Sequence, residues 1–164
     1  MGQHRHLYVF GPTDVLAGLK VSEPAELVWD KGRNGSGDVT APWAPAHEPI
    51  SFVVSKFRHA GEAGKTAIPV RMRKGSVLRY GPPTGRNVRH PSEKPVPLLR
   101  ELIESSSRQG ETILDPYAGV GSTGVAAILA GRRAILVELD PRYVPIAVDR
   151  LKRAEAIAKE ASKC

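Results

Sequence analysis

The chain has 164 residues, of which 41% are hydrophobic and 25% charged, a composition typical of one globular domain with a substantial core. It has a single cysteine, Cys164, so no disulfide can form within the chain, and no apolar run reaches the length of a membrane span. These features exclude a disulfide-stapled scaffold and a membrane helix bundle, and we expect a cytoplasmic protein.

The net charge of +7 is concentrated in one part of the chain. Residues 56–94 contain ten Lys or Arg against two Glu, so this stretch alone carries +8. A polyanion partner, most simply DNA or RNA, explains such a concentration, although a solvated basic surface has the same composition. We predict that the segment 56–89 contacts nucleic acid through Arg71, Arg73, Lys74, Arg79, Arg86 and Arg89.

The first half of the chain has the pattern of short strands joined by loops. Apolar runs at 7–10 (LYVF), 26–30 (ELVWD) and 50–55 (ISFVVS) predict three strands, and residues 14–20 predict one or two helical turns. The stretch 31–45 is rich in Gly, Asn and Pro and is interpreted as a loop, so the second and third strands could pair antiparallel. Farther on, 67–72 and 77–80 predict at most short strands.

The second half has longer and more regular periodicity. Apolar residues at helical spacing predict a helix that ends before Gly110, with one face formed by Leu98, Leu99, Leu102 and Ile103. A strand ending at Asp115, a glycine turn, a small-residue helix at 125–130 ended by Gly131, and a strand at 134–139 follow.

The last helix is predicted to begin near Pro141, with Asp140 as its N-cap. Pro145 is expected to distort its first turn. The buried stripe of this helix is predicted to contain Tyr143, Ile146, Ala147, Leu151 and Ala154.

Strand, glycine loop, helix, strand and acid form the layout of a nucleoside-cofactor site. The loop allows close approach to the backbone, the helix N-terminus favours negative charge, and Glu138 can accept hydrogen bonds from ribose hydroxyls. Glycines 119, 121 and 124 match the dinucleotide fingerprint, so a nicotinamide-dependent enzyme is one interpretation. However, the string Asp-Pro-Tyr-Ala at 115–118 stands before the first glycine, and Asp115 at the strand end suits a cofactor with a positive charge or an amino group, such as S-adenosylmethionine.

Residues 115–123 (DPYAGVGST), followed by GR at 131–132 and ELD at 138–140, resemble the S-adenosylmethionine-binding motif of the DNA amino-methyltransferases. These enzymes methylate the exocyclic nitrogen of adenine or cytosine. Residues 90–95 (HPSEKP) resemble the motif before the cofactor loop in the permuted branch of that family, and WDK at 29–31 and HEPI at 47–50 are similar to the same branch.

The resemblance implies an α/β fold, a Rossmann-like S-adenosylmethionine-dependent methyltransferase sheet with helices on both faces. It implies a single domain over 1–164, with a cofactor-binding half at 90–151 and a target-recognition-like segment at 56–89. The implied cofactor is S-adenosyl-L-methionine and the implied partner is DNA. No metal site is expected, because His47-Glu48 lacks a second histidine at helical spacing.

Matched position by position, the resemblance also implies the cofactor-binding residues. Glu138 would accept from the ribose, Lys94 would approach the carboxylate end of the methionine, and the hydroxyl of Ser122 or Thr123 would bind that carboxylate. The loop itself would be formed by Asp115, Pro116, Tyr117, Gly119 and Gly121.

A second motif of that family, Asp/Asn/Ser-Pro-Pro followed by an aromatic residue, holds the flipped base, and this chain does not contain it. The nearest string, YGPPT at 80–84, lacks both the acceptor and the aromatic residue. In the permuted branch this motif lies N-terminal to all the segments above, on a strand beside the one that ends at Asp115.

We therefore expect an incomplete sheet. The chain would be a truncated product, half of a split enzyme completed by a second chain, or a remnant whose strands pair directly. No catalytic residue is assigned, and we expect little methyl transfer by the chain alone. The alternatives are a non-catalytic DNA-binding remnant and, third, a nicotinamide-dependent enzyme.

Overall fold

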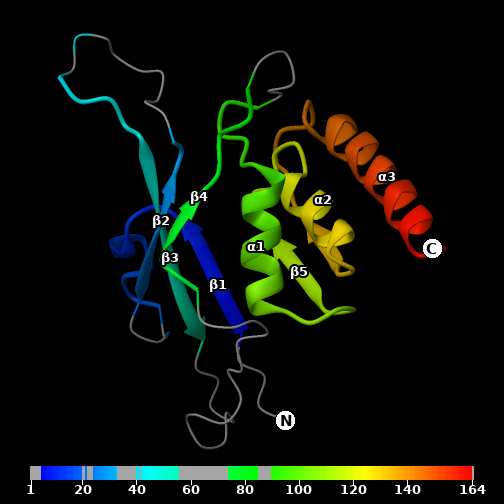
Figure 1. The fold of residues 1–164 in the computed structure, drawn as a ribbon, viewed down its shortest axis with the longest axis horizontal. Coiled ribbons are helices and arrows are strands. Elements are labelled where there is room, and N and C mark those ends of the chain that lie inside the picture. Colours follow the sequence, from blue (N-terminus) through cyan, green and yellow to red (C-terminus); the bar gives the residue numbers. More distant parts are fainter. Residues whose placement is uncertain are drawn as a thin grey trace, which may run out of the picture. The chain divides into compact units, whose positions relative to one another are not determined.

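The computed structural model describes residues 5–19, 21, 24–32, 40, 42–55, 74–84 and 90–163. The chain divides into two compact units, Met1–Gly81 and Pro82–Cys164. The first unit is built around a mixed sheet and the second around a β–α–β element flanked by helices (Figure 1). Among the described residues, no helix is both long enough and apolar enough to cross a bilayer.

The first unit contains a four-stranded sheet in the order β1-β3-β2-β4. Its strands are β1 (Arg5–Phe10), β2 (Ala25–Asp30), β3 (His47–Ser55) and β4 (Val77–Arg79). Strand β3 pairs antiparallel with both β1 and β2, which confirms the predicted pairing of the second and third strands. Strand β4 pairs parallel with β2. The strand expected at 67–72 lies outside the described residues.

Large side chains from the two central strands form the core of the first unit. Trp29, Ile50 and Val53 are almost fully buried. The indole N–H of Trp29 donates to the carbonyl of Tyr80 at 2.7 Å, which satisfies its one polar group and ties β2 to the end of β4. Of the one or two helical turns predicted at 14–20, the described residues form one, the 3-10 turn Thr13–Leu16, after which Gly18 turns the chain with φ +84°.

The second unit contains α1 (Val96–Ser106), β5 (Thr112–Asp115), α2 (Ser122–Leu129), β6 (Arg133–Leu136) and α3 (Val144–Ala161). Strands β5 and β6 are parallel, with Asp115 opposite Leu136. The ladder continues past the strand ends, since the N–H of Val137 donates to Asp115 and that of Ala118 to Val137, both at 2.9 Å. This parallel β–α–β arrangement confirms the predicted α/β class.

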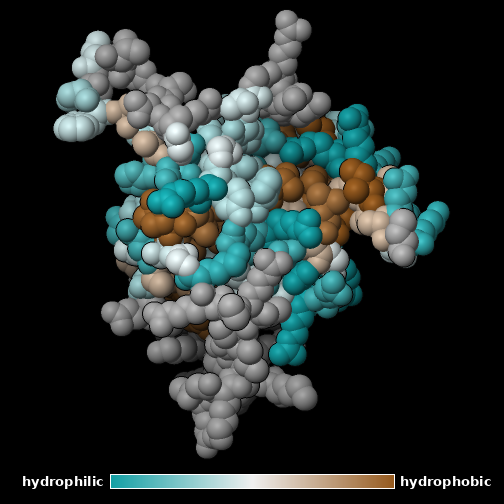
Figure 2. Space-filling view, viewed as in Figure 1, coloured by the Kyte–Doolittle hydropathy of each residue, from teal (hydrophilic) through white to brown (hydrophobic). Residues whose placement is uncertain are grey.

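Helix α2 lies between α1 and α3, and small residues allow this close packing. Ala126 and Ala127 are fully buried, and a Cβ added at Gly124 would lie 2.6 Å from side-chain atoms of both Leu136 and Leu151. Figure 2 shows hydrophobic surface where α2 lies between its neighbours. A helix that is apolar on nearly every side is typical of a central position in a domain.

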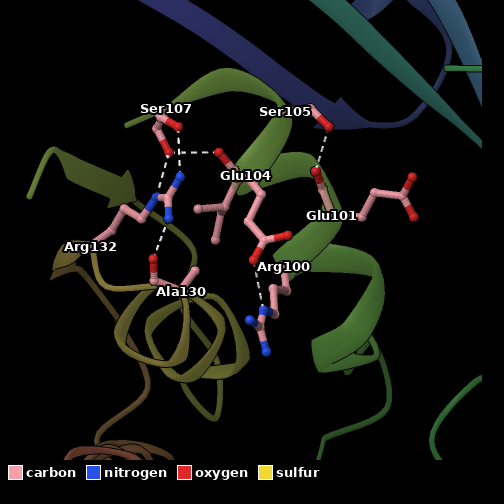
Figure 3. A network of polar contacts seen from close by, with 8 residues as sticks. Arg100, Glu101, Glu104, Ser105, Ser107, Ala130 and Arg132 are labelled. Atoms are coloured by element: carbon pink, nitrogen blue, oxygen red, sulfur yellow. Dashed lines mark hydrogen bonds and ion pairs between the residues drawn. The ribbon is translucent and has the colours of Figure 1, made fainter. Parts of the chain in front are cut away.

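A polar network joins the C-terminal ends of α1 and α2 (Figure 3). The guanidinium of Arg132 donates to the carbonyl of Ala130, to the carbonyl of Ser107 at 2.7 Å and to the Ser107 hydroxyl at 3.2 Å. That hydroxyl donates to Ile103 at 2.6 Å, near the end of α1. One arginine thereby satisfies carbonyls that the two helix ends would leave without partners. Gly131, at φ +73°, ends α2 as predicted.

The start of α3 differs from the prediction. Residues 141–143 form a turn and the helix begins at Val144, with Tyr143 rather than Asp140 as the N-cap. The Asp140 carboxylate accepts instead from the backbone N–H of Arg142 at 2.9 Å and from its guanidinium, so the side chain is engaged before the helix begins. Pro145 is the second helical residue, a position whose N–H needs no helical partner, so it fits the first turn without breaking it.

The sheet face opposite α2 is apolar. Leu136 points toward α2, so the alternate residues Ile135 and Val137 point away from it, and both are exposed together with Leu114 and Leu139. Among the described residues, β5 and β6 pair only with each other. The described part of this parallel sheet therefore has two open edges and one uncovered apolar face.

Candidate functional site

A cavity of about 100 Å³ lies in the second unit, where β5 ends and α2 begins. Six of the nine residues predicted to bind the cofactor line it: Lys94, Asp115, Tyr117, Gly119, Ser122 and Thr123. Pro116, Gly121 and Glu138 are not part of the lining. The fold thus brings the segment before α1 together with the glycine loop, although α1 and β5 lie between them in sequence.

Asp115 shapes the exit from β5. Its Oδ1 accepts from the backbone N–H of Tyr117 at 2.9 Å, which is the geometry of a turn closed by an aspartate side chain. An ionised carboxylate offers about four lone-pair positions, so the group has further capacity for a donor in the cavity. Tyr117 lines the cavity yet is 90% exposed, so its ring presents an open apolar surface at the cavity mouth.

The two loop glycines have different functions. Gly119 has φ +52° and lines the cavity, and a Cβ added there would come no closer than 3.8 Å to any neighbour, the His90 ring. Gly121 has φ +77°, and an added Cβ would lie 3.0 Å from the Cβ of Ala147 in α3. Gly119 therefore gives the loop its turn beside the cavity, whereas Gly121 allows the loop to pack against α3.

Glu138 ties the glycine loop to the segment after β6. Its Oε2 accepts from the N–H of Gly119 at 2.6 Å, and its Oε1 accepts from the N–H of Asp140 at 2.8 Å. These hydrogen bonds, Asp140 first and then Gly119, lower the pKa of the Glu138 carboxyl. The hydrogen bonds and charge of Arg142 lower the pKa of Asp140 to about 2. Both carboxylates are ionised at neutral pH.

The two hydroxyls at the start of α2 differ in their surroundings. Ser122 is buried, and its Oγ donates toward Glu93 at 3.4 Å and accepts from Arg150 at 3.2 Å. Thr123 is half-buried and lines the cavity. Of the two hydroxyls expected to bind a carboxylate, only Thr123 lies outside that polar cluster.

Sequence reasoning missed several lining residues, namely His90, Ser92, Glu93, Leu99, Ala118 and Val120. Of the HPSEKP motif at 90–95, only Lys94 is among the residues predicted to bind the cofactor. The His90 ring packs edge-on against Tyr143 with centroids 4.5 Å apart, and its Nδ1 accepts from the N–H of Ser92 at 3.1 Å. An imidazole with these contacts forms a wall of the cavity beside Gly119.

The predicted DNA-binding residues are only partly described. Arg71, Arg73, Arg86 and Arg89 lie outside the described residues, and Lys74 is exposed. Arg79 donates to the Asp30 carboxylate at 3.2 Å. A hydrogen bond from the N–H of Gly32, followed by the contact with Arg79, lowers the pKa of Asp30. Within the described ranges, no three His, Cys, Asp or Glu side chains cluster as metal ligands would.

Comparison with known protein families gives one match that covers most of the chain. A family model described as DNA methylase, of the N6/N4 type, matches residues 20–149. The DNA adenine methyltransferase YhdJ of Escherichia coli (strain K12) is 39% identical over 71 residues, 43% of this chain and 24% of YhdJ. The Type II methyltransferase M2.DpnII of Streptococcus pneumoniae is 44% identical over 64 residues, 39% of this chain and 24% of that protein. The chain thus spans about a quarter of the length of either relative.

Solved structures share the fold. The M1.HpyAVI–SAM complex matches with a TM-score of 0.65 at 20% identity, over 89% of this chain and 74% of that one. A DNA modification methylase of Thermus thermophilus, TTHA0409, crystallised with S-adenosyl-L-methionine, matches with a TM-score of 0.57 at 26% identity. That match covers 84% of this chain and 55% of TTHA0409.

Proposed function

The chain belongs to the family of DNA methylases that act on N6 of adenine or N4 of cytosine, and we propose that it supplies the S-adenosyl-L-methionine-binding part of such an enzyme. The reaction would transfer a methyl group to the exocyclic amino nitrogen of a base in DNA. The nicotinamide-dependent enzyme and the non-catalytic DNA-binding remnant are not favoured by these matches.

The observation that carries the proposal is the geometry around Gly119. The glycine turn borders the cavity, and the Glu138 carboxylate accepts from the N–H of Gly119 at 2.6 Å. With about four lone-pair positions, Glu138 can hold the loop and still accept from a ribose hydroxyl. Asp115 and Lys94 add a negative and a positive group to the cavity wall, which suits a ligand carrying both an ammonium and a carboxylate.

When bound, S-adenosylmethionine would supply an electrophilic methyl group on a sulfonium centre. The residues of this chain would bind and orient it. Glu138 would accept from the ribose, Asp115 would accept from the amino group, and Lys94 and Thr123 would donate to the carboxylate. The cavity of about 100 Å³ is smaller than the roughly 300 Å³ at which ligand pockets usually begin, so we propose that further chain completes the walls.

Calorimetric titration of the full chain with S-adenosylmethionine tests this function. We expect saturable binding by the wild type and a loss of about tenfold or more in Glu138→Gln, because the variant loses the charged acceptor for the ribose hydroxyl. Glu155→Gln is the matched control, since Glu155 is an exposed carboxylate on α3, and it should bind like the wild type. Absence of binding by the wild type, or full affinity in Glu138→Gln, would contradict the proposal.

We also propose that methyl transfer needs a base-holding segment from outside this sequence, on the same or a second polypeptide. Two observations support this. The Pro-Pro-aromatic motif is not present, and the described parallel sheet has open edges and the uncovered apolar residues Leu114 and Ile135. Strands added at these edges would pair the backbone and cover the face.

Transfer of labelled methyl groups to duplex DNA measures this requirement directly. The chain alone should give only background transfer, and a chain that contains the Pro-Pro-aromatic motif should restore activity when the two are combined. Steady turnover by the purified chain alone would overturn the requirement for a further segment.

A further inference from the structure

A partly buried polar cluster joins three separate parts of the second unit. Arg150, on α3, donates through Nη1 to the carbonyl of Val120 at 2.9 Å and to the Ser122 hydroxyl at 3.2 Å. Its Nη2 lies 2.9 Å from the carboxylate of Glu93. One guanidinium therefore contacts the glycine loop, the first residue of α2 and the segment before α1.

The burial of this ion pair distinguishes it from the other pair on the same helix. The side chains of Arg150 and Glu93 are 19% and 6% exposed, whereas those of Arg153 and Asp149 are 70% and 52% exposed. Water and salt screen an exposed pair, so its net contribution is small. Loss of one partner from a buried pair removes a charged contact that water does not replace, which has a much larger effect.

The cluster borders the cavity. Val120, Ser122 and Glu93 line the cavity, whereas Arg150 does not. Glu93 precedes Lys94, the cation proposed to approach the carboxylate of the ligand. The position of Arg150 thus determines where two cavity walls stand relative to each other, although Arg150 has no surface in the cavity.

We propose that Arg150 is a positioning residue for the cofactor, and this inference rests on the proposed function. It holds the Val120–Ser122 loop and the Glu93–Lys94 segment at the separation that receives the amino-acid end of S-adenosylmethionine. The Ser122 hydroxyl belongs to this clamp, so Thr123 is the hydroxyl that contacts the ligand carboxylate. Lysine cannot replace the arginine fully, because its single ammonium lacks the planar fork that spans several acceptors.

The test measures two ligands in the full chain by calorimetry. S-adenosylmethionine has the amino-acid end, and 5′-methylthioadenosine has the same nucleoside without it. We expect Arg150→Met to weaken the binding of S-adenosylmethionine by about tenfold or more, because one buried charged contact is lost. The binding of 5′-methylthioadenosine should weaken by no more than about twofold. Arg150→Lys should recover part of the affinity, and Arg153→Met, the exposed control on the same helix, should bind both ligands like the wild type.

Glu93→Gln breaks the same ion pair from its other side, so it can replace Arg150→Met if that variant fails to fold. In the double variant the two losses should be less than additive, since both changes break one contact. Equal weakening of both ligands would assign Arg150 a purely structural role and overturn the inference, as would unchanged affinity in Arg150→Met. If the wild type binds neither ligand, the proposed function fails, and the inference fails with it.

Discussion

At the scale of single residues, the two loop glycines differ in why a side chain is unfavourable there. Backbone strain applies at both positions, whereas steric contact with another element applies at only one. Gly119 and Gly121 both have positive φ, but only Gly121 lies against another element, the backbone and Cβ of Ala147. A left-handed conformation costs an alanine about 1–2 kcal/mol, and overpacking adds about 1–3 kcal/mol. The same substitution should therefore have unequal effects two residues apart.

We predict that Gly121→Ala lowers the free energy of unfolding by about 2–5 kcal/mol, the sum of strain and overpacking. Gly119→Ala should lose only about 1–2 kcal/mol, since the nearest neighbour of its Cβ is 3.8 Å away. Urea denaturation followed by circular dichroism measures both values. Equal losses would show that α3 does not pack against the loop as described.

The carboxylates at the end of β6 make stability depend on pH. The pKa values of Glu138 and Asp140 are below their ordinary values of 4.5 and 3.8, and that of Asp140 is about 2. The unfolded chain then binds more protons in acid than the folded chain, so stability is complete above the ordinary values and is lost as pH falls toward 2.

We predict that the wild type is more stable than Glu138→Gln at pH 7 and that this difference shrinks as pH falls below about 4.5. Protonation removes the charged acceptor from the wild type, whereas the neutral amide of the variant has no charge to lose in this range. Urea midpoints of both proteins from pH 7 to pH 2 provide the measurement. A constant difference across this range would mean that the Glu138 carboxylate does not stabilise the fold.

At the scale of elements, the ends of α1 and α2 depend on a residue that belongs to neither helix. Arg132 precedes β6 and satisfies the carbonyls of Ser107 and Ala130. The spacing of apolar residues predicted both helices, but periodicity describes only the faces of helices and not the partners of their terminal carbonyls. The same limit explains the wrong N-cap at Asp140, where the adjacent Arg142 captured the carboxylate.

We predict that Arg132→Met destabilises the chain by about 2–3 kcal/mol, because charge-assisted hydrogen bonds to Ser107 and Ala130 are lost together. Arg133→Met is the matched control at the next position, where the side chain is exposed. It should change stability by no more than about 0.5 kcal/mol. Urea denaturation measures the free energy of unfolding of both variants. Comparable losses of stability would show that the network of Figure 3 is not the cause.

At the scale of the whole molecule, the distribution of charge separates proposed DNA binding from proposed cofactor binding. The segment 56–89 has nine Lys or Arg against one Glu, whereas the residues proposed to bind the cofactor lie at 94–138. Contacts between cations and phosphates release counterions, so each contact adds about 0.9 to the slope of log affinity against log salt. The proposed DNA contacts can therefore be counted without knowledge of the target sequence.

We predict that replacing Arg71, Arg73, Arg86 and Arg89 by Ala reduces the salt slope for duplex DNA by about 3–4, one phosphate contact for each arginine. Replacing Lys152, Arg153, Lys159 and Lys163, four exposed cations on or after α3, removes the same charge and should leave the slope nearly unchanged. Fluorescence anisotropy between about 50 and 200 mM salt gives both slopes. Equal reductions of the slope in the two variants would show that DNA binding depends only on the net charge of the chain.

The sequence by itself determined the order of strands and helices, the glycine turn and the identity of the acids around it. These features follow from local patterns, because periodicity, turns and cofactor motifs each lie within a short stretch of sequence. The family followed from the same local string at 115–123, and the match over residues 20–149 confirms it.

Only the tertiary structure decided which groups meet. It shows that Gly119 borders the cavity, whereas Gly121 packs against Ala147. It placed the Ser122 hydroxyl in a cluster with Glu93 and Arg150, which come from positions 29 residues before and 28 residues after it. No periodicity links residues at such separations, because their contact follows from the packing of α3 and the pre-α1 segment around the loop. The physical reason is that hydrogen bonds and ion pairs depend on distances in space, which the packed core sets.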